Sequence, residues 1–284
     1  MIVGVVTPVR NAAGLITDTV HSVLDQSALR DRSVQVRYVI QDGDSTDGTA
    51  DVARLATDGR ATVMSTPDTG MYDALARGFA EIENQGGADW YCYLNAGDLW
   101  DPRCLEVLSH VAQHTQSSWV CGLHAYFGAN GSLVHTKLPF RYRRDLLRAG
   151  AYGRGLPTVQ QESTFWRSDL HSLMDMRALS AYAVAGDSYL WWTFAHTAEP
   201  TIIEALLGGF RYHGGHLGVS KVEYRDELNR FAGPLTPLVR ARIPAERALW
   251  EQPARVKASL NPNLLRYDTS TGGWRAQVAT LPPC

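Results

Sequence analysis

Acidic side chains follow apolar, strand-like runs at several separate places in this 284-residue chain. The stretch YLNAGDLW, residues 93–100, ends one such run at the single carboxylate of Asp98. The stretch QDGDSTDGT follows another run and contains Asp42, while AGDSYLWW contains Asp187. Carboxylates bind hard divalent cations and also accept protons as general bases. These positions are therefore candidates for metal binding or for acid–base catalysis.

The spacing of apolar residues predicts strands that alternate with helices through the first 123 residues. The predicted strands are 2–7 (ended by Pro8), 35–41, 61–65, 89–94 and 118–123, and the predicted helices are 12–26, 49–56, 71–84 and 101–115. Such alternation predicts an α/β fold with a mostly parallel sheet and helices on both faces. Ligands of such sheets bind beyond the carboxyl ends of the strands. The loops TPVRN, QDGDSTDG and NAGD should all open there.

The pattern becomes irregular after residue 124. We expect a hairpin around Asn130–Gly131, an extended segment over 158–167, and a helix entered at Asp187, for which this aspartate is also a good N-cap. A helix over KVEYRDELNRF and a tail richer in proline follow. We predict a domain over 1–220, with halves at 1–123 and 124–220. A helical and irregular extension covers 221–284, and its tail from Gly233 to Cys284 would wrap the domain or meet a partner. A homo-oligomer formed through the extension is left open.

Composition excludes several classes of protein. The net charge of −2 gives no sign of a nucleic-acid partner. No segment approaches the ~20 uninterrupted apolar residues of a transmembrane helix, and the N-terminal apolar run is too short for a signal peptide. The four cysteines show no CxxC spacing, so we expect free thiols in a reducing compartment. We predict a cytoplasmic protein, with peripheral association at the inner face of the membrane left open.

The motifs as a set resemble the GT-A glycosyltransferases of family two. TPVRNAAGLITDTVHSVLDQS resembles that family's first strand and helix, and QDGDSTDGT resembles its DDGSTDGT loop. PDTGMYDALARGFAEI followed by DWYCYLNAGD resembles the approach to its DxD metal motif, and QQESTFWR and AGDSYLWW resemble its acceptor-side segments. These motifs are most similar to those of the subset of the family that builds bacterial exopolysaccharides. No QxxRW motif is present, so a processive synthase is not expected.

This resemblance implies a nucleotide-sugar donor, a saccharide, lipid-linked or small-molecule acceptor, and an inverting single displacement. The donor would be held by residues of the strand-end loops. The implied substrate-binding residues are Thr7, Pro8, Arg10, Asn11, Asp42, Asp68, Gly70, Asp73, Arg77, Asn95, Ala96, Gly97 and Gln161. Of these, Asp42 would contact the nucleobase or ribose, or form only an Asx-turn. Arg10 and Arg77 would approach the diphosphate or lie in solvent.

The resemblance also implies a divalent metal, Mn²⁺ or Mg²⁺, beside the leaving diphosphate. Asp98 is the predicted ligand, and the alternative is that it helps to cap the helix after Asp101–Pro102. Asn95 matches the first family carboxylate but is uncharged, which predicts a weaker site that forms with the donor. His213 and His216, in the closing loop GGFRYHGGHLGVS, are further candidate ligands.

Asp187 is the predicted general base and Glu162 the second candidate. Three other readings compete with a transferase. A nucleotidyl transferase would carry a lysine in its first loop, and a dehydrogenase would carry GxGxxG, and neither is present. A degenerate transferase that binds a sugar nucleotide or a partner without turnover is favoured only by the missing carboxylate at Asn95.

Overall fold

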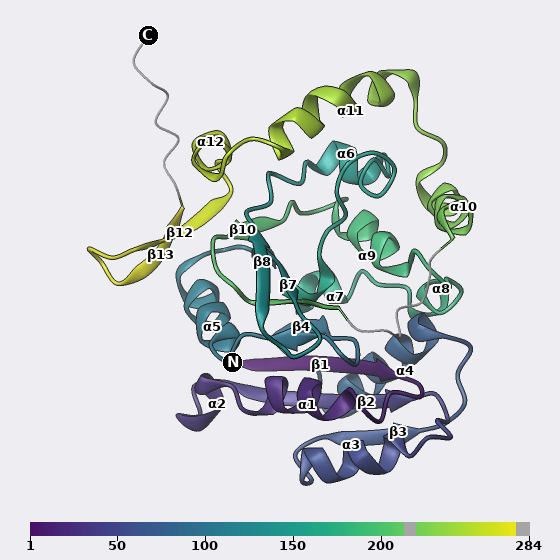
Figure 1. Ribbon diagram of the computed structural model, residues 1–284. Coiled ribbons are helices and arrows are strands. Elements are labelled where there is room, and N and C mark those ends of the chain that lie inside the picture. Colours follow the sequence, from purple (N-terminus) through teal and green to yellow (C-terminus); the bar gives the residue numbers. More distant parts are fainter. Residues whose placement is uncertain (213–219, 277–284) are drawn as a thin grey trace.

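A computed structural model describes residues 1–212 and 220–276. A sheet of nine strands forms its centre, in the order β13-β12-β10-β6-β9-β4-β1-β2-β3 (Figure 1). These strands are β1 (Ile2–Val9), β2 (Gln35–Asp42), β3 (Thr62–Ser65), β4 (Trp90–Tyr93), β6 (Trp119–Cys121), β9 (Thr164–Arg167), β10 (Thr201–Ile203), β12 (Leu264–Asp268) and β13 (Gly273–Ala276). The mixed, mostly parallel sheet of the predicted α/β class is confirmed.

Most neighbouring strands of this sheet are parallel, but β9 is antiparallel to both β4 and β6. The prediction that Pro8 ends the first strand was wrong, because β1 continues to Val9. β4 pairs only with Val3–Val6, so at Pro8 the strand has a ladder partner on the β2 side alone. A proline is tolerated where one ladder is already absent.

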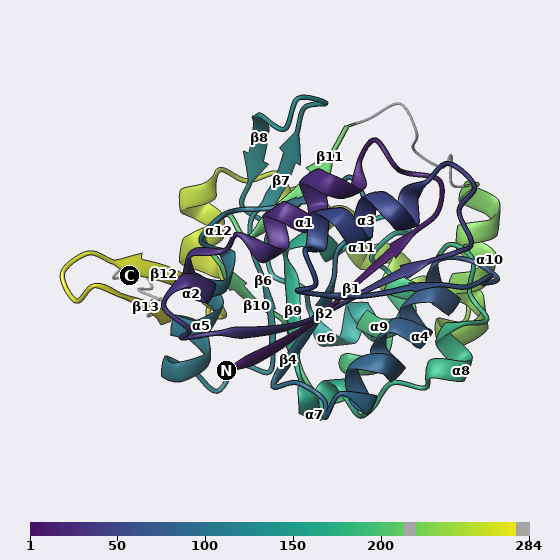
Figure 2. The ribbon, with the colours of Figure 1, turned by 90° about the horizontal axis from the view of Figure 1, so that it is seen from below.

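Helices cover both faces of the amino-terminal half of the sheet. Figure 2 shows α1 and α3 on one side of β1 and β2 and α4 on the other. The helices of this half are α1 (Ile16–Leu24), α2 (Ser27–Arg30), α3 (Thr49–Thr57), α4 (Met71–Asn84) and α5 (Cys104–His114). A Cβ at Gly78 would overlap the side chain of Val6, so this glycine lets α4 lie directly on β1.

A second sheet of four strands, in the order β5-β11-β7-β8, stands beside the first. Its strands are β5 (Leu99–Trp100), β7 (His124–Phe127), β8 (Leu133–Lys137) and β11 (Gly208–Arg211). β7 and β8 form the hairpin predicted around Asn130–Gly131. β5 follows directly from the NAGD turn, so this turn links the two sheets.

The half over residues 124–220 contains short helices, and the predicted extended segment 158–167 needs one correction. Gln161–Ser163 form a 3-10 turn, η1, and only Thr164–Arg167 are extended. The helices here are α6 (Arg144–Arg148), α7 (Ser168–His171), α8 (Met176–Leu179) and α9 (Gly186–Phe194). Trp191 is buried and stacks on Trp119 with ring centroids 5.5 Å apart, so it belongs to the core.

The C-terminal extension packs into the body of the molecule. It contains α10 (Lys221–Ala232), α11 (Pro237–Trp250) and α12 (Ala254–Leu260), and β12 adds to the main sheet beside β10. The sequence prediction treated residues from Gly233 onward as a tail around the domain, which missed this pairing. Trp250 is 1% exposed and lies 5.0 Å from the ring of Tyr142 and 6.2 Å from that of Tyr152.

Two further expectations concern thiols and membrane spans. Cys92, Cys104 and Cys121 are buried and unpaired, and Cys284 lies outside the described residues. Within residues 1–212 and 220–276, no helix combines the length and apolar character needed to cross a membrane.

We predict that Trp250→Ala lowers the free energy of unfolding by about 3–5 kcal/mol, because it empties an aromatic site in the core. Denaturant titration of the whole chain measures this loss. Leu238→Ala, at a position 74% exposed on the same helix, is the control and should change stability by less than about 0.5 kcal/mol. A small effect of Trp250→Ala would mean that the Trp250 ring does not fix α11 to the core.

Candidate active site

A buried threonine of α1 fixes the NAGD turn through two hydrogen bonds. Thr19 Oγ1 accepts a hydrogen bond from Gly97 N at 2.8 Å and donates one to Asp98 O at 3.0 Å. Gly97 has φ of +106°, a backbone conformation that favours glycine. Asp98 does not cap α5, since Asp101 accepts the Arg103 N–H at 2.9 Å at that helix start. The turn instead directs the Asp98 carboxylate inward, towards the second sheet.

Asp98 and Glu162 form a buried carboxyl pair between the two sheets. Asp98 Oδ1 accepts a hydrogen bond from Arg211 N of β11 at 3.0 Å, and its side chain lies within hydrogen-bonding reach of Glu162. Burial raises the pKa of both carboxyl groups, and the adjacent Glu162 charge raises that of Asp98 further. Like charges this close cannot both ionise without cost. We infer that Asp98 holds a proton that it shares with Glu162 when no cation is bound.

Two amides at the same edge of the sheet hold buried polar atoms without partners. Asn95 Oδ1 makes no hydrogen bond, and neither amide atom of Gln161 makes one of good geometry within the described part of the chain. Such groups are uncommon in folded proteins, because each costs the desolvation of an unpaired donor or acceptor. Both residues were predicted to bind substrate, and their unpaired atoms are available to a ligand.

Asp187 lies in the first turn of α9, and its carboxylate does not cap that helix. The N–H groups of residues 183, 184 and 185 all donate to the Glu227 carboxylate of α10, at 2.7, 3.0 and 2.8 Å. The N-cap expectation for Asp187 was wrong, because α9 begins at Gly186 with Ala185 as its N-cap residue, which places Asp187 inside the first turn. Asp187 Oδ1 accepts the adjacent Ser188 N–H, at 2.6 Å.

The surroundings of Asp187 make it a stronger base than an ordinary aspartate. Burial is the main cause that raises its pKa to about 6, against the lowering effect of hydrogen bonds from Ser188 and Tyr72. Tyr72 packs against Gly186, where a Cβ would come within 2.5 Å of its ring. The pKa of Tyr93 is raised by burial and by the nearby Tyr72, Asp187 and Glu162. Sequence reasoning left Tyr72 open and did not single out Tyr93.

The loops after β1 and β2 are joined by a network of short polar side chains. Asn11, with φ of +50°, donates its N–H to Ser45 Oγ at 2.8 Å and accepts the Thr46 N–H at 3.0 Å. Asp47 accepts N–H groups from Ala13 and Thr49, as expected of a turn residue. This network fixes the distance between the two loops that are predicted to hold the donor.

Asp42 and Thr7 lie beneath these loops and are fully buried. Asp42 accepts hydrogen bonds from Ser45 Oγ, from Ser45 N at 3.1 Å and from Ser65 Oγ at 2.6 Å. Thr7 Oγ1 is 2.9 Å from the Tyr38 hydroxyl, and Pro8 is buried beside it. Asp42 therefore forms the predicted turn and ties it to β3. A contact of these residues with a nucleotide stays a prediction.

The segment 68–77 forms a second polar edge beside the first loops. Arg77 pairs with Asp73, with Nη2 to Oδ2 at 2.9 Å, and also donates to Pro67 O at 2.8 Å. Its guanidinium is thus occupied, whereas Arg10 is exposed and its charge acts on Asp68. Burial raises the pKa of Asp68, whose Oδ1 accepts the Gly70 N–H at 3.0 Å. Gly70 has φ of +143° with open space in front of it.

The oxygen ligands at the strand ends fit a divalent cation only in part. No group of three His, Cys, Asp or Glu side chains within 1–212 and 220–276 is arranged to hold a metal. Asp98 and Glu162 are nevertheless two adjacent buried carboxyl groups, and Asn95 Oδ1 is an unpaired oxygen. Mg²⁺ is usually bound by one or two carboxylates together with substrate phosphates and water. The residues present fit a cation that arrives with a diphosphate. His213 and His216 lie outside the described residues.

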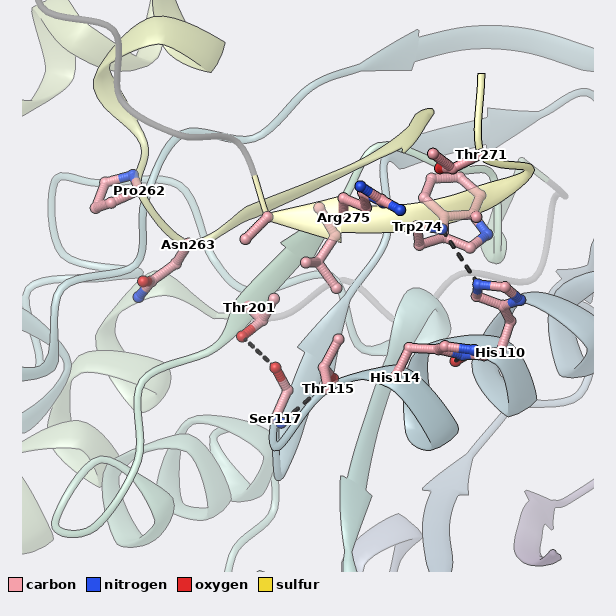
Figure 3. A pocket seen from close by; sticks show the side chains of 13 residues that line it. His110, His114, Thr115, Ser117, Thr201, Pro262, Asn263, Thr271, Trp274 and Arg275 are labelled. Carbon is pink, nitrogen blue, oxygen red and sulfur yellow. Dashed lines mark hydrogen bonds between the residues drawn. The ribbon is translucent and has the colours of Figure 1, made fainter. Parts of the chain in front are cut away.

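A cavity of about 630 Å³ lies elsewhere, between the end of α5, β10 and the β12–β13 hairpin (Figure 3). Its polar groups pair with one another. The hydroxyls of Ser117 and Thr201 are 2.9 Å apart, and His110 Nε2 accepts the Trp274 N–H at 3.3 Å. None of the predicted site residues lines this cavity, so it is not the candidate active site.

The nine-stranded sheet, the NAGD turn and the carboxylates at the strand ends define a protein of the GT-A glycosyltransferase class. Residues 4–171 match the family model described as glycosyl transferase family 2. The match covers more than half of the chain, and the chain belongs to this family. No curated protein matches it.

Solved structures with similar folds are distant in sequence. The structure of residues 1–349 of S. aureus TarS has a TM-score of 0.57 at 13% identity, over 93% of this chain and 70% of that one. The match to the longer TarS structure covers 42% of that chain. Glucosyl-3-phosphoglycerate synthase from Mycobacterium tuberculosis, solved with Mn²⁺, UDP-glucose and phosphoglyceric acid, has a TM-score of 0.51 at 18% identity over 83% of this chain and 81% of that one. At these identities the likeness establishes the GT-A fold.

The carboxyl pair should cost stability at alkaline pH. A carboxyl group whose pKa is raised by folding holds its proton longer in the folded state, so stability falls as pH rises from about 4 through the folded pKa. We predict that Asp98→Asn, which can still accept the Arg211 N–H, raises the free energy of unfolding at pH 8 by on the order of 1–3 kcal/mol. Denaturant titrations at pH 5 and pH 8 in EDTA measure it.

Asp226→Asn, on the exposed side of α10, is the matched control and should change neither value. If wild type and Asp98→Asn show the same dependence of stability on pH, Asp98 and Glu162 do not share a proton.

Proposed function

We propose that the chain is an inverting transferase that moves a sugar from a nucleotide-sugar donor to an acceptor hydroxyl, with Asp187 as the general base. The observation that carries this proposal is the state of Asp187. Its carboxylate lies in the first turn of α9 without capping that helix, and its pKa of about 6 suits a base that works near neutral pH. A saccharide, lipid-linked or small-molecule acceptor remains the expectation from sequence.

Glu162 is the weaker candidate for the base. Its carboxyl group is buried in the pair with Asp98, and its backbone oxygen accepts the Trp100 Nε1–H at 3.1 Å. A Cβ at Gly208 would overlap that same oxygen, so η1 is packed closely against β11. A carboxylate this tightly held serves better as part of the donor side than as a mobile proton acceptor.

The proposed step is a single displacement. The acceptor hydroxyl gives its proton to Asp187 while its oxygen forms a bond to the anomeric carbon. The bond from that carbon to the diphosphate oxygen breaks, and its electron pair leaves with the nucleoside diphosphate. A divalent cation held by Asp98 and the diphosphate would neutralise the charge that develops on the leaving group. Asn95 and Gln161 would form hydrogen bonds with the nucleotide sugar through their unpaired amide atoms.

Asp187→Asn should keep donor binding and lose activity by at least 10²–10⁴-fold, the usual contribution of a general base. A panel of nucleotide sugars, assayed with and without Mn²⁺ for release of the nucleoside diphosphate, measures turnover, and calorimetry measures binding. Glu162→Gln is the comparison and should lose less activity than Asp187→Asn. Equal turnover by Asp187→Asn and wild type would overturn the assignment. Donor binding by wild type without any turnover would support a binding-only protein.

The rate should also depend on pH through Asp187. A base is active when it is ionised, so kcat/KM should fall about tenfold per pH unit below about 6 and level off above it. Rates from pH 4.5 to 8, with stability checked at each pH, test this. A flat profile through pH 6 contradicts the role of Asp187.

The effect of a divalent metal on binding of the nucleoside diphosphate should depend on Asp98. In wild type, Mn²⁺ should tighten binding of the nucleoside diphosphate and raise the melting temperature in its presence. In Asp98→Asn the gain in affinity that Mn²⁺ gives should be at least tenfold smaller, because one carboxylate ligand is lost. The rise in melting temperature should be smaller for the same reason. Calorimetric titration with and without Mn²⁺ is the measurement. Unchanged affinity in Asp98→Asn would mean that the carboxyl pair only joins the two sheets.

A further inference from the structure

A cavity of about 640 Å³ opens between α10, the loop that follows α6 and the start of α11. Four cationic side chains line it and no carboxylate does, so we call it the basic pocket. Its cations are Arg154, Lys221, Arg225 and Arg240. Lys221 and Arg225 lie one turn apart on α10, and Asn229 of the same helix lines the next turn. The volume lies within the usual range for small-ligand sites, about 300–1,000 Å³.

The cations of this pocket lack counter-ions. Within the described residues, none of the four lies within 4 Å of a carboxylate oxygen, whereas Arg141, Arg143 and Arg211 all pair with carboxylates. Arg154 is the clearest case. Its Nη1 donates to Gly233 O at 2.6 Å, while Nε and Nη2 are buried without a partner. Unpaired buried guanidinium nitrogens are costly, so Arg154 beside three exposed cations fits an anionic ligand.

The position of the basic pocket points to the acceptor. Tyr224 lines it, and the Tyr224 hydroxyl is 2.7 Å from Ser188 Oγ, next to Asp187. Ser188 N in turn donates to Asp187 Oδ1 at 2.6 Å. All lining residues come from position 153 onward, and none comes from the loops after β1, β2 and β4 that are predicted to hold the donor. The pocket therefore lies on the side from which a hydroxyl would reach the base.

We propose that the acceptor carries a phosphate group, which the basic pocket binds while the acceptor hydroxyl faces Asp187. This inference rests on the proposed transferase function and narrows its acceptor class. A phosphate with one or two negative charges compensates several cations better than a carboxylate does, and arginine binds phosphate in bidentate fashion. The phosphate belongs either to a soluble sugar phosphate or to a phosphate-linked lipid.

The test uses the double variant Arg225→Ala/Arg240→Ala, since both side chains are exposed and their loss should leave the fold intact. Calorimetry compares glucose 6-phosphate with glucose, and co-sedimentation compares phosphatidylcholine vesicles with and without polyprenyl phosphate. We expect wild type to prefer at least one phosphorylated probe at least tenfold, and the double variant to lose that preference. Arg177→Ala/Arg255→Ala, which removes two exposed arginines outside the pocket, should retain it.

The pattern across the two probes identifies the source of the phosphate. Binding of the sugar phosphate alone indicates a soluble acceptor, and binding of the polyprenyl phosphate vesicles indicates a lipid-linked one. No preference in wild type, or equal preference in the double variant, overturns the proposal. Loss of UDP or GDP affinity in the double variant would also overturn it, because the pocket would then belong to the donor.

Failure of this proposal can be distinguished from failure of the transferase function. If the double variant transfers sugar as fast as wild type at limiting acceptor, the phosphate site is wrong and the transferase stands. If phosphate binding depends on the pocket while no donor in the panel turns over, the transferase function fails and only an anion site remains. Asp187→Asn should bind the phosphorylated probe as wild type does.

Discussion

The buried carboxyl pair of Asp98 and Glu162 is the constraint on which the rest of the structure depends. The pair lies where the chain passes from the first sheet to the second, so elements of both sheets must hold its two residues in place. Thr19 fixes the NAGD turn from α1, and the Arg211 N–H fixes the Asp98 carboxylate from β11. Gly208 allows β11 to pass directly over η1. Two acids brought together in this way oppose folding, and the surrounding hydrogen bonds keep them in place.

The same design separates structural from chemical carboxylates. Asp42, Asp47, Asp73 and Glu227 each accept three hydrogen bonds from backbone, hydroxyl or guanidinium groups. Asp187 accepts few such bonds, and burial rather than pairing sets its pKa. A proton acceptor must keep a free lone pair, whereas a loop anchor must use all of its own. Glu227 belongs to the structural class, because it holds the approach to α9 through the N–H groups of residues 183–185.

Much of this arrangement could be predicted from residue types and from the local spacing of apolar residues. The long-range pairings could not be predicted in this way. Helix α4 begins at Met71 and ends at Asn84 as predicted, since its apolar positions and Gly70 define it locally. The capping of residues 183–185 by Glu227 joins positions 40 or more apart, and no local pattern encodes that choice. The insertion of β9 between β4 and β6 is non-local in the same sense. The β12–β13 hairpin could have been found from LLRYD and the turn DTSTGG.

The C-terminal extension connects stability with specificity. Trp250 fixes α11 in the aromatic core around Tyr142, and α11 thereby places Arg240 opposite the cations of α10. Glu227 and Tyr224, on that same α10, reach the start of α9, one through backbone N–H groups and the other through Ser188. One helix thus contacts the start of α9, where the proposed base Asp187 lies, and forms a wall of the basic pocket. Under the proposed function, a change in acceptor could therefore be accommodated by substitutions on α10 and α11 without altering the strand ends that are proposed to hold the donor.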